Sequence, residues 1–234
     1  MNLSEALKKK YTKEKMSAFD AQRLAEFIAF GPVVFQASRL MIKFGILDLL
    51  NDHSQGMTCE ELVEATGLSD YAVKCLTDAS LSSGTILIDD ETDKFKLSKT
   101  GYFLLHDPAT RANIDFNHDV NYRGWFYLEE ALKEGRPAGL KTLGDWPTIY
   151  EGLSSLEPQV QKSWFGFDHF YSDSSFPEAM YQMTYKNSEK GKKLKICMNK
   201  YFFSFYFVSS RILWASKAFS FSFLICCAVS SKGS

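Results

Sequence analysis

Histidine and carboxylate side chains are the groups in this sequence whose types could support acid–base chemistry. The four histidines are His53, His106, His118 and His169. Histidine gains or loses a proton near neutral pH more readily than any other side chain. His169 follows Asp168 in the aromatic stretch FGFDHFY, and this pair is the best candidate for contact with a substrate. A histidine with a purely structural role is the simpler interpretation.

Aromatic side chains crowd around this pair. Residues 148–180 contain Tyr150, Trp164, Phe165, Phe167, Phe170, Tyr171 and Phe176. They could form the wall of an apolar small-molecule pocket, although packing in a core is the commoner role for any one aromatic residue. We therefore take Trp164, Phe167, Asp168 and His169 as substrate-side candidates, and we assign no catalytic residue.

Metal and nucleophile chemistry finds little support. Asp115, His118 and Asp119 have the i, i+3, i+4 spacing of a helical metal site, but two carboxylates and one histidine occur together often by chance, so we expect no metal. The sequence contains no P-loop, GxSxG, HExxH or CxxC motif, which argues against nucleophilic and metal-dependent hydrolases.

The cysteines and the first residues indicate the compartment. The five cysteines are odd in number and have no framework spacing, which favours a reducing environment without disulfides or structural zinc. The start, MNLSEALKKKYTKEK, has no apolar run after its charges and does not resemble a secretory signal. We expect a cytoplasmic protein.

Residues 56–105 predict the element around which the chain is organised. Thr58 with Glu61 forms a capping box for a first helix that ends at Gly67. A second helix, capped by Ser69, runs to Gly84. Strands at 85–88 and 94–97 enclose a polar turn, and a closing helix follows Ser98. The pattern predicts a mainly α fold, a winged helix made of a helix-turn-helix plus a β-hairpin, with additional α-helices.

Winged helices often read DNA, but the charges here disfavour that function. The second helix carries one basic residue, Lys74, beside Asp70 and Asp78, and the hairpin turn reads DDETD. DNA binding needs lysine and arginine facing the phosphates. We expect no nucleic-acid partner and favour an interaction or dimerisation role.

Two helices that precede this module are apolar on more than one face. Ser17 is expected to cap the first, Gly31-Pro32 to interrupt it, and Gly45 to bend or break the second before residues 46–50. A helix that is apolar nearly all round is buried on several sides, in a core or in a subunit interface. Because a large exposed apolar patch is unusual on a monomer, we predict a homodimer.

After the module, one long helix is expected at 111–135, followed by a loop at 136–147 and the aromatic segment 148–180. The residues expected to face inward in the long helix are Ile114, Phe116, Val120, Trp125, Phe126, Leu128 and Leu132. The predicted domains are a polar leader at 1–16, a winged-helix dimerisation domain at 17–106, a helical linker that covers a substrate pocket at 107–180, and an aberrant tail at 181–234.

The tail differs from the rest of the chain in charge. Residues 1–180 carry 18 Lys and Arg against 27 Asp and Glu, whereas residues 181–234 carry 9 against 1. We expect a tail that is irregular or weakly helical and that arises from a frameshift or a truncated gene. The alternative is a membrane anchor at 201–229, which Arg211 and Lys217 disfavour by dividing the apolar run.

The order of these elements resembles the N-terminal part of class I S-adenosylmethionine (SAM)-dependent O-methyltransferases that carry a winged-helix dimerisation domain. The stretches that carry the resemblance are FQASRLMIKFGILDLL (35–50), MTCEELVEATGLSDYAVKCLTDASLSSGTI (57–86), FKLSKTGYFLL (95–105), WFYLEEALKEGRPAG (125–139) and TIYEGLSSLEPQVQKSWFGFDHFYSDSSFPEAM (148–180). For the intact family it implies SAM as cofactor, a small-molecule hydroxyl as methyl acceptor, and a segment containing residues 164–169 along the acceptor pocket.

The family pattern departs at the catalytic domain. A strand ending in a glycine-rich GxGxG turn should hold SAM, but no GxG triplet occurs in these 234 residues. We therefore expect a truncated methyltransferase-like chain that binds no SAM by itself and has no cofactor-binding or catalytic residues of its own. The alternatives are a non-catalytic winged-helix interaction or regulatory module, and a membrane-tethered scaffold through 201–229.

Overall fold

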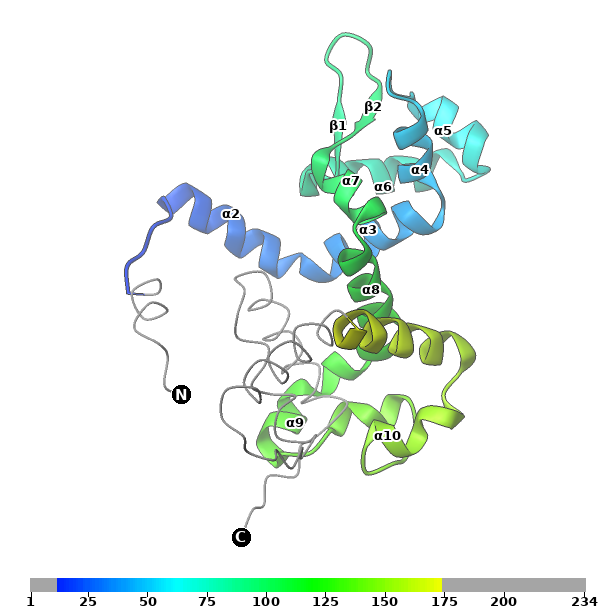
Figure 1. The fold of residues 1–234 in the computed structure, drawn as a ribbon. Coiled ribbons are helices and arrows are strands. Elements are labelled where there is room, and N and C mark those ends of the chain that lie inside the picture. The colour runs from blue at the N-terminus through cyan, green and yellow to red at the C-terminus, as the bar shows by residue number, and fades with distance from the viewer. Residues whose placement is uncertain (1–11, 174–234) are drawn as a thin grey trace, which may run out of the picture. The chain divides into compact units, whose positions relative to one another are not determined.

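The computed structural model describes residues 12–173, which divide into two compact units (Figure 1). The first unit ends at Asp107 and the second begins at Pro108. The first holds α2 (Ala18–Ala29), α3 (Gly31–Lys43), α4 (Ile46–Asp52), α5 (Cys59–Thr66), α6 (Asp70–Ser83), β1 (Ile86–Ile88), β2 (Phe95–Leu97) and α7 (Lys99–His106). The fold is mainly α, as the sequence predicts.

Local capping sets the helix boundaries of the first unit. The Thr58 hydroxyl accepts the Glu61 N–H at 3.2 Å, and the Glu61 carboxylate accepts the Thr58 N–H at 2.8 Å, which completes the predicted capping box of α5. Ser69 and Ser98 cap α6 and α7 in the predicted way. Gly84 ends α6 with φ 72°, in the left-handed region that glycine adopts without strain.

The first two helices are separated where the sequence places a break. Ser17 caps α2 through the Asp20 N–H, and Pro32 lies in the first turn of α3. Helices α2 and α3 are bent by 70° relative to each other. Gly45, with φ 73°, separates α3 from α4. The predicted interruptions are confirmed.

The hairpin packs against the helix-turn-helix with a short antiparallel register. Ile86 pairs with Leu97 and Ile88 with Phe95, and Phe95 also forms a bridge to Met57. The predicted helix-turn-helix plus β-hairpin is thus present. Around it lies a core whose buried residues are Ala37, Met41, Ile46, Leu47, Leu50, Met57, Leu62, Val73, Leu76, Ile86 and Phe95.

The hairpin turn is held by Asp89. Its Oδ1 accepts the backbone N–H groups of Glu91 and Thr92, and Lys96 Nζ lies 2.5 Å from its Oδ2. The hydrogen bond from Lys96 is the largest cause that holds the pKa of the Asp89 carboxyl well below its ordinary range. One carboxylate of the acidic turn is therefore paired with a lysine of the adjacent strand β2.

The second unit replaces the predicted long helix with four short pieces. They are α8 (Pro108–Phe116), the π-helix η1 (Asn117–Asn121), the 3-10 helix η2 (Gly124–Tyr127) and α9 (Leu128–Glu134). The prediction of a single helix at 111–135 is wrong. The hydrogen-bonding pattern changes at η1 and η2, and this change turns the side chains that follow toward other faces than an unbroken α-helix would. Ile114, Phe116 and Val120 are buried as predicted, whereas Phe126 is 89% exposed and Leu132 54% exposed.

The rest of the second unit wraps around a second core. After α9 come η3 (Ala138–Thr142), α10 (Ile149–Gly152), η4 (Leu153–Ser155) and a helical segment at 158–173. The buried residues of this core are Phe116, Val120, Leu140, Ile149, Leu156, Trp164 and Phe167. Trp146 packs against it, between Gly144 and Gly152. A Cβ at either glycine would lie within 2.3 Å of the indole, so both positions need glycine.

Part of the predicted organisation lies outside the described residues. This holds for most of the leader 1–16, the end of the segment 107–180, the tail 181–234 and its anchor alternative 201–229. Within residues 12–173, no single helix has both the length and the apolar character needed to cross a membrane. Helices α2 and α3 taken together meet that test by length and composition only, as a bent pair.

Candidate functional site

Helix α2 presents apolar side chains to solvent along its whole length. Every residue from Thr12 to Phe30 is exposed, and α2 has no buried residue. Figure 1 shows α2 running out from the start of α3, away from α4–α7. The large apolar side chains exposed on α2 and at its junction with α3 are Phe19, Leu24, Phe27, Ile28, Phe30 and Val33. Together they form what we call the α2 surface.

A narrower seam crosses this surface. Ala21, Leu24, Ala25 and Ile28 follow the i, i+3, i+4, i+7 spacing, which aligns them on one face of a helix. Phe27 adjoins the seam. The two alanines leave room for a second backbone to approach, so the seam has the shape that another helix would fit.

The polar side of α2 is occupied by local contacts. Arg23 lies over the Phe19 ring, 5.7 Å from its centroid. Gln22 Nε2 donates to Glu26 Oε1 at 3.4 Å. The Ser17 hydroxyl donates to Asp20 Oδ2 at 2.7 Å. These contacts keep charge off the seam, which leaves the apolar face available for an interaction.

The four substrate-side candidates lie on two sides of the segment 158–173. Trp164 and Phe167 are buried, 8% and 7% exposed, and both rings contact Phe116. Asp168 and His169 are exposed, and His169 Nδ1 lies 3.7 Å from the Asp173 carboxylate. The structure therefore brings the two rings together in the core and leaves the other pair on the surface.

Helical periodicity contains the signal for this division. Val160, Ser163, Trp164, Phe167 and Tyr171 share one face at helical spacing, and all are at least partly buried. Asp168 and His169 fall outside that stripe. The assignment of all four to a substrate stays a prediction.

Asp119 forms a polar link that sequence reasoning missed. Its Oδ2 accepts from Ser163 Oγ at 2.5 Å and from Gln159 Nε2 at 2.9 Å, and its side chain is 9% exposed. His118 Nε2 lies 3.8 Å from Asp119 Oδ1. The link joins the π-helix η1 to the segment 158–173. No local pattern could have found it, because the two partners lie 40 and 44 residues from Asp119 in sequence.

A shallow hollow of about 370 Å³ lies beside this link. Its lining includes His118, Tyr122, Arg123, Leu143, Leu156 and Glu157. The four substrate-side candidates are not among the residues that line it. π-Helical turns often accompany functional sites, and η1 contributes His118, Asp119 and Val120 to this wall.

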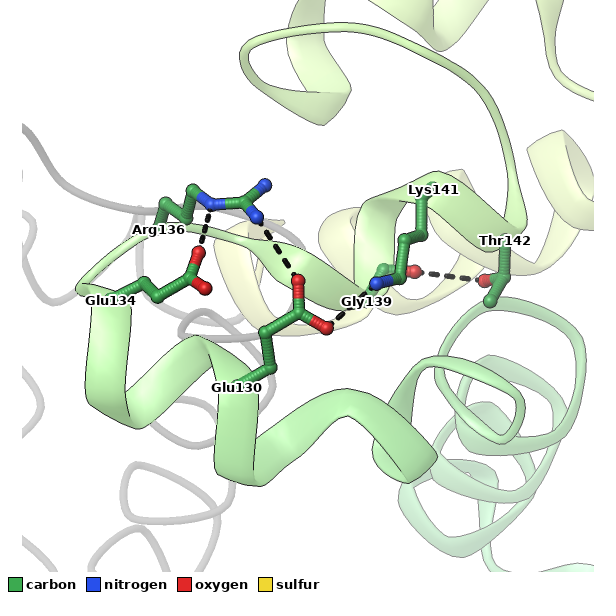
Figure 2. Close-up of polar contacts among 6 residues, drawn as sticks. All are labelled: Glu130, Glu134, Arg136, Gly139, Lys141 and Thr142. Atoms are coloured by element: carbon green, nitrogen blue, oxygen red, sulfur yellow. Dashed lines mark hydrogen bonds and ion pairs between the residues drawn. The ribbon is translucent and has the colours of Figure 1, made fainter.

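An ion-pair cluster fixes the neighbouring 3-10 helix η3 (Figure 2). Glu130 on α9 accepts from Lys141 Nζ at 2.7 Å and from Arg136 Nη2 at 3.0 Å, and Arg136 also contacts Glu134. Lys141 lies over the Tyr127 ring at 4.0 Å. The hydrogen bond from Lys141 is the largest cause that lowers the pKa of Glu130. The cluster clamps α9 to η3.

The other candidate groups have structural contacts. His106 lies in the last turn of α7, and its ring nitrogen Nε2 is hydrogen-bonded to the Asn51 side chain at 3.0 Å. Cys59 is a free thiol whose pKa is raised chiefly by burial and further by Asp70, which makes it less reactive. Among residues 12–173, no group of three or more His, Cys, Asp or Glu residues could hold a metal ion.

The comparison with family models bears on the first unit. A family model, the Dimerisation2-like domain, matches residues 22–95. Among proteins with curated functions, none matches the sequence.

Solved structures share the fold. The S-adenosylmethionine-dependent methyltransferase SibL has 20% identity and a TM-score of 0.56 over 64% of this chain and 44% of its own. RosA from Streptomyces davawensis, an N,N-8-amino-8-demethyl-D-riboflavin dimethyltransferase, has 25% identity and a TM-score of 0.51 over 72% of this chain and 48% of its own. A pericyclic reaction enzyme has 14% identity and a TM-score of 0.53 over 69% of this chain and 42% of its own.

The chain spans less than half the length of each of these three structures. The family model covers α3 to the start of β2 and most of α2, and the structural likeness reaches beyond it. Residues 22–95 therefore match a Dimerisation2-like domain, and the described part of the chain shares its fold with part of the SAM-dependent methyltransferase SibL and of the dimethyltransferase RosA.

Proposed function

We propose that this chain is the dimerisation and substrate-covering part of a SAM-dependent O-methyltransferase-like protein. The observation that carries the proposal is the α2 surface, which exposes large apolar side chains within a segment that matches a dimerisation domain. Monomeric proteins seldom expose contiguous apolar patches of this kind without a partner. A second copy of the chain is the partner that a dimerisation domain implies.

The homodimer is tested by light scattering and sedimentation of the full chain. We expect a dimer at micromolar concentration and a monomer for Phe27→Asp/Ile28→Asp, because burying two carboxylates without partners is costly. The control is Gln22→Asp, which adds a carboxylate on the polar side of the same helix. A wild-type chain that stays monomeric up to about 100 μM, weaker than a typical specific dimer, would refute the homodimer.

We further propose that these 234 residues do not bind SAM by themselves. Family members of this kind cradle the cofactor with a parallel strand, a glycine-rich turn and a helix. Among residues 12–173 the sheet is the antiparallel pair β1 and β2, which does not fit that cradle, and the full sequence contains no GxG triplet. Isothermal titration should give no heat of binding with SAM, and a micromolar dissociation constant would contradict the proposal.

The proposed truncation is tested at the gene. A DNA sequence across the codons for residues 170–234 and several hundred bases downstream should reveal a shifted frame that encodes a strand followed by GxGxG. If the reading frame is intact and no frame downstream encodes such a stretch, the truncation is wrong and the tail requires its own explanation.

The substrate-covering role concerns the second unit. Its aromatic core places Trp164 and Phe167 beside Phe116, and the hollow at His118 and Arg123 lies in the same unit. We propose that this unit contributes, through Trp164, Phe167, Asp168 and His169, to the wall of an acceptor pocket in an intact enzyme. The fold also occurs in a pericyclic reaction enzyme, so the fold leaves the reaction open and the acceptor must be identified by experiment.

The charge pattern supports an interaction module without nucleic acid. Lys74, the basic residue of α6, is paired with Asp70 at 2.8 Å, and Lys96 of the hairpin is paired with Asp89. In each pair the carboxylate competes with a phosphate for the lysine. A gel-shift assay at low salt should show no shift with duplex DNA, and a shift would favour a regulatory DNA-binding role.

A further inference from the structure

Helix α2 has few means of holding its own conformation. It is 12 residues long, and isolated helices of about that length are marginal in water. None of its residues is buried, so packing among residues 12–173 does little to stabilise it. Phe19, Phe27 and Ile28 are aromatic or β-branched residues, which have lower intrinsic helix propensity than alanine.

The neighbouring helix does not extend into α2. The chain turns by 70° at the junction of α2 and α3, where Gly31-Pro32 begins the second helix. Helix propagation needs a continuous hydrogen-bond ladder, and this junction breaks it. The Ser17 cap and the contact of Arg23 with Phe19 are local and weak. Within residues 12–173 these are weak supports, so α2 needs a further surface to stabilise it.

We infer that α2 folds only when a second copy of the chain covers it, so that helix formation and dimerisation are one coupled equilibrium. This inference rests on the proposed homodimer. The family model begins at residue 22, within α2, which places this helix in the dimerisation domain. The seam of Ala21, Leu24, Ala25 and Ile28 has the spacing that receives another helix.

Charge favours a copy of the same chain over an anionic surface. Asp20, Arg23 and Glu26 put both signs of charge on α2. In a two-fold symmetric contact the same patch meets itself, so the uncharged seam would meet an uncharged seam and no like charges would be brought together there. A net negative helix has no attraction to an acidic lipid headgroup.

Hydrogen exchange of the full chain at two concentrations tests the inference. Above the dimer dissociation constant, the amides of residues 22–30 should be protected. Below it they should exchange about 100-fold faster, as expected for a segment that opens locally, while the amides of α6 change less than about twofold. Helix α6 is the internal control because it is packed in the core of the first unit.

Alanine variants separate lost contact from lost helix propensity. Leu24→Ala/Ile28→Ala raises the intrinsic propensity of α2, since alanine is the best helix former, and removes the side chains of the seam. We expect weaker dimerisation and loss of α2 protection at a concentration where the wild type is protected. The matched control, Gln22→Ala on the polar side, should keep both the dimer and the protection.

The outcomes distinguish this inference from the homodimer itself. If the chain dimerises but α2 is equally protected in the monomer, the coupling is wrong and the homodimer stands. If the chain is monomeric at every concentration, the homodimer fails and the coupling with it. If vesicles of phosphatidylserine and phosphatidylcholine protect α2 under conditions where no dimer forms, a lipid surface is the occupant and the inference is overturned.

Discussion

Helices α2 and α6 start in the same way and reach opposite environments. Each is capped by a serine, Ser17 or Ser69, that accepts the N–H of the third residue of the helix. Helix α6 then buries Val73, Leu76, Thr77 and Ser80, whereas α2 buries nothing. A cap sets where a helix begins, but burial decides how much the helix contributes to the stability of the chain.

The largest expected effect is on the free energy of unfolding when leucine is replaced by alanine once in each environment. Leu62→Ala, at a fully buried leucine, should lower the free energy of unfolding by about 2–5 kcal/mol. Leu24→Ala, at an exposed leucine of α2, should change the free energy of unfolding of the monomer by less than about 0.5 kcal/mol. Urea denaturation of the dilute protein, followed by circular dichroism, measures both free energies of unfolding. Equal losses in the two variants would show that α2 is packed as tightly as the core.

A second pair compares glycines. In Gly101→Ala the new Cβ would lie 2.3 Å from the Thr85 carbonyl oxygen and 2.6 Å from Leu97 Cδ1, so we expect a loss of about 1–3 kcal/mol. In Gly31→Ala, at the start of α3, the new Cβ would meet nothing within 4 Å. That variant should be neutral or slightly stabilising in the same denaturation experiment. A larger loss at residue 31 would show that the α2–α3 junction is packed.

The caps give a smaller effect. Ser69→Ala should cost about 1 kcal/mol of monomer stability, because a buried helix loses its N-cap. Ser17→Ala should leave the melting temperature of the monomer unchanged and weaken the dimer instead. Thermal melts at low and high protein concentration measure the two effects. A monomer destabilised by Ser17→Ala would mean that α2 already contributes to the isolated fold.

The smallest expected effect depends on pH. The folded pKa of Asp89 is lowered, so its contribution to stability is fully present above the unfolded value of about 3.9 and is lost as the pH falls toward the folded pKa. Asp89→Asn removes this contribution. The difference in melting temperature between wild type and variant should be constant from about pH 5 to 8 and shrink below about pH 4. A difference that grows on acidification would contradict the role of Lys96.

Sequence reasoning succeeded where the determinants are local. The capping box at Thr58, the serine caps and the breaks at Gly31-Pro32 and Gly45 all lie within a few residues of the boundaries that they set. The hairpin strands match to within one residue at each end. In each case a side chain or a backbone angle decides the outcome without help from distant parts of the chain.

The second unit was harder because its helices change hydrogen-bonding pattern. The π-turn at Asn117–Asn121 has no periodic signature, yet it rotates everything after it, which is why Phe126 was expected inside and lies outside. The link from Asp119 to Ser163 depends on the fold and could not be read from the sequence. The separation of Trp164 from His169 was accessible from helical spacing alone.

The indole of Trp146, held between Gly144 and Gly152, contributes a fluorescence signal that belongs to the second unit alone. The tryptophans of the chain are at positions 125, 146, 164 and 214, so the first unit has none. Tryptophan emission therefore follows the residues after Asp107, while the dimerisation domain contributes only tyrosine signals. One unfolding experiment read at two wavelengths can thus establish whether the two units melt together or apart.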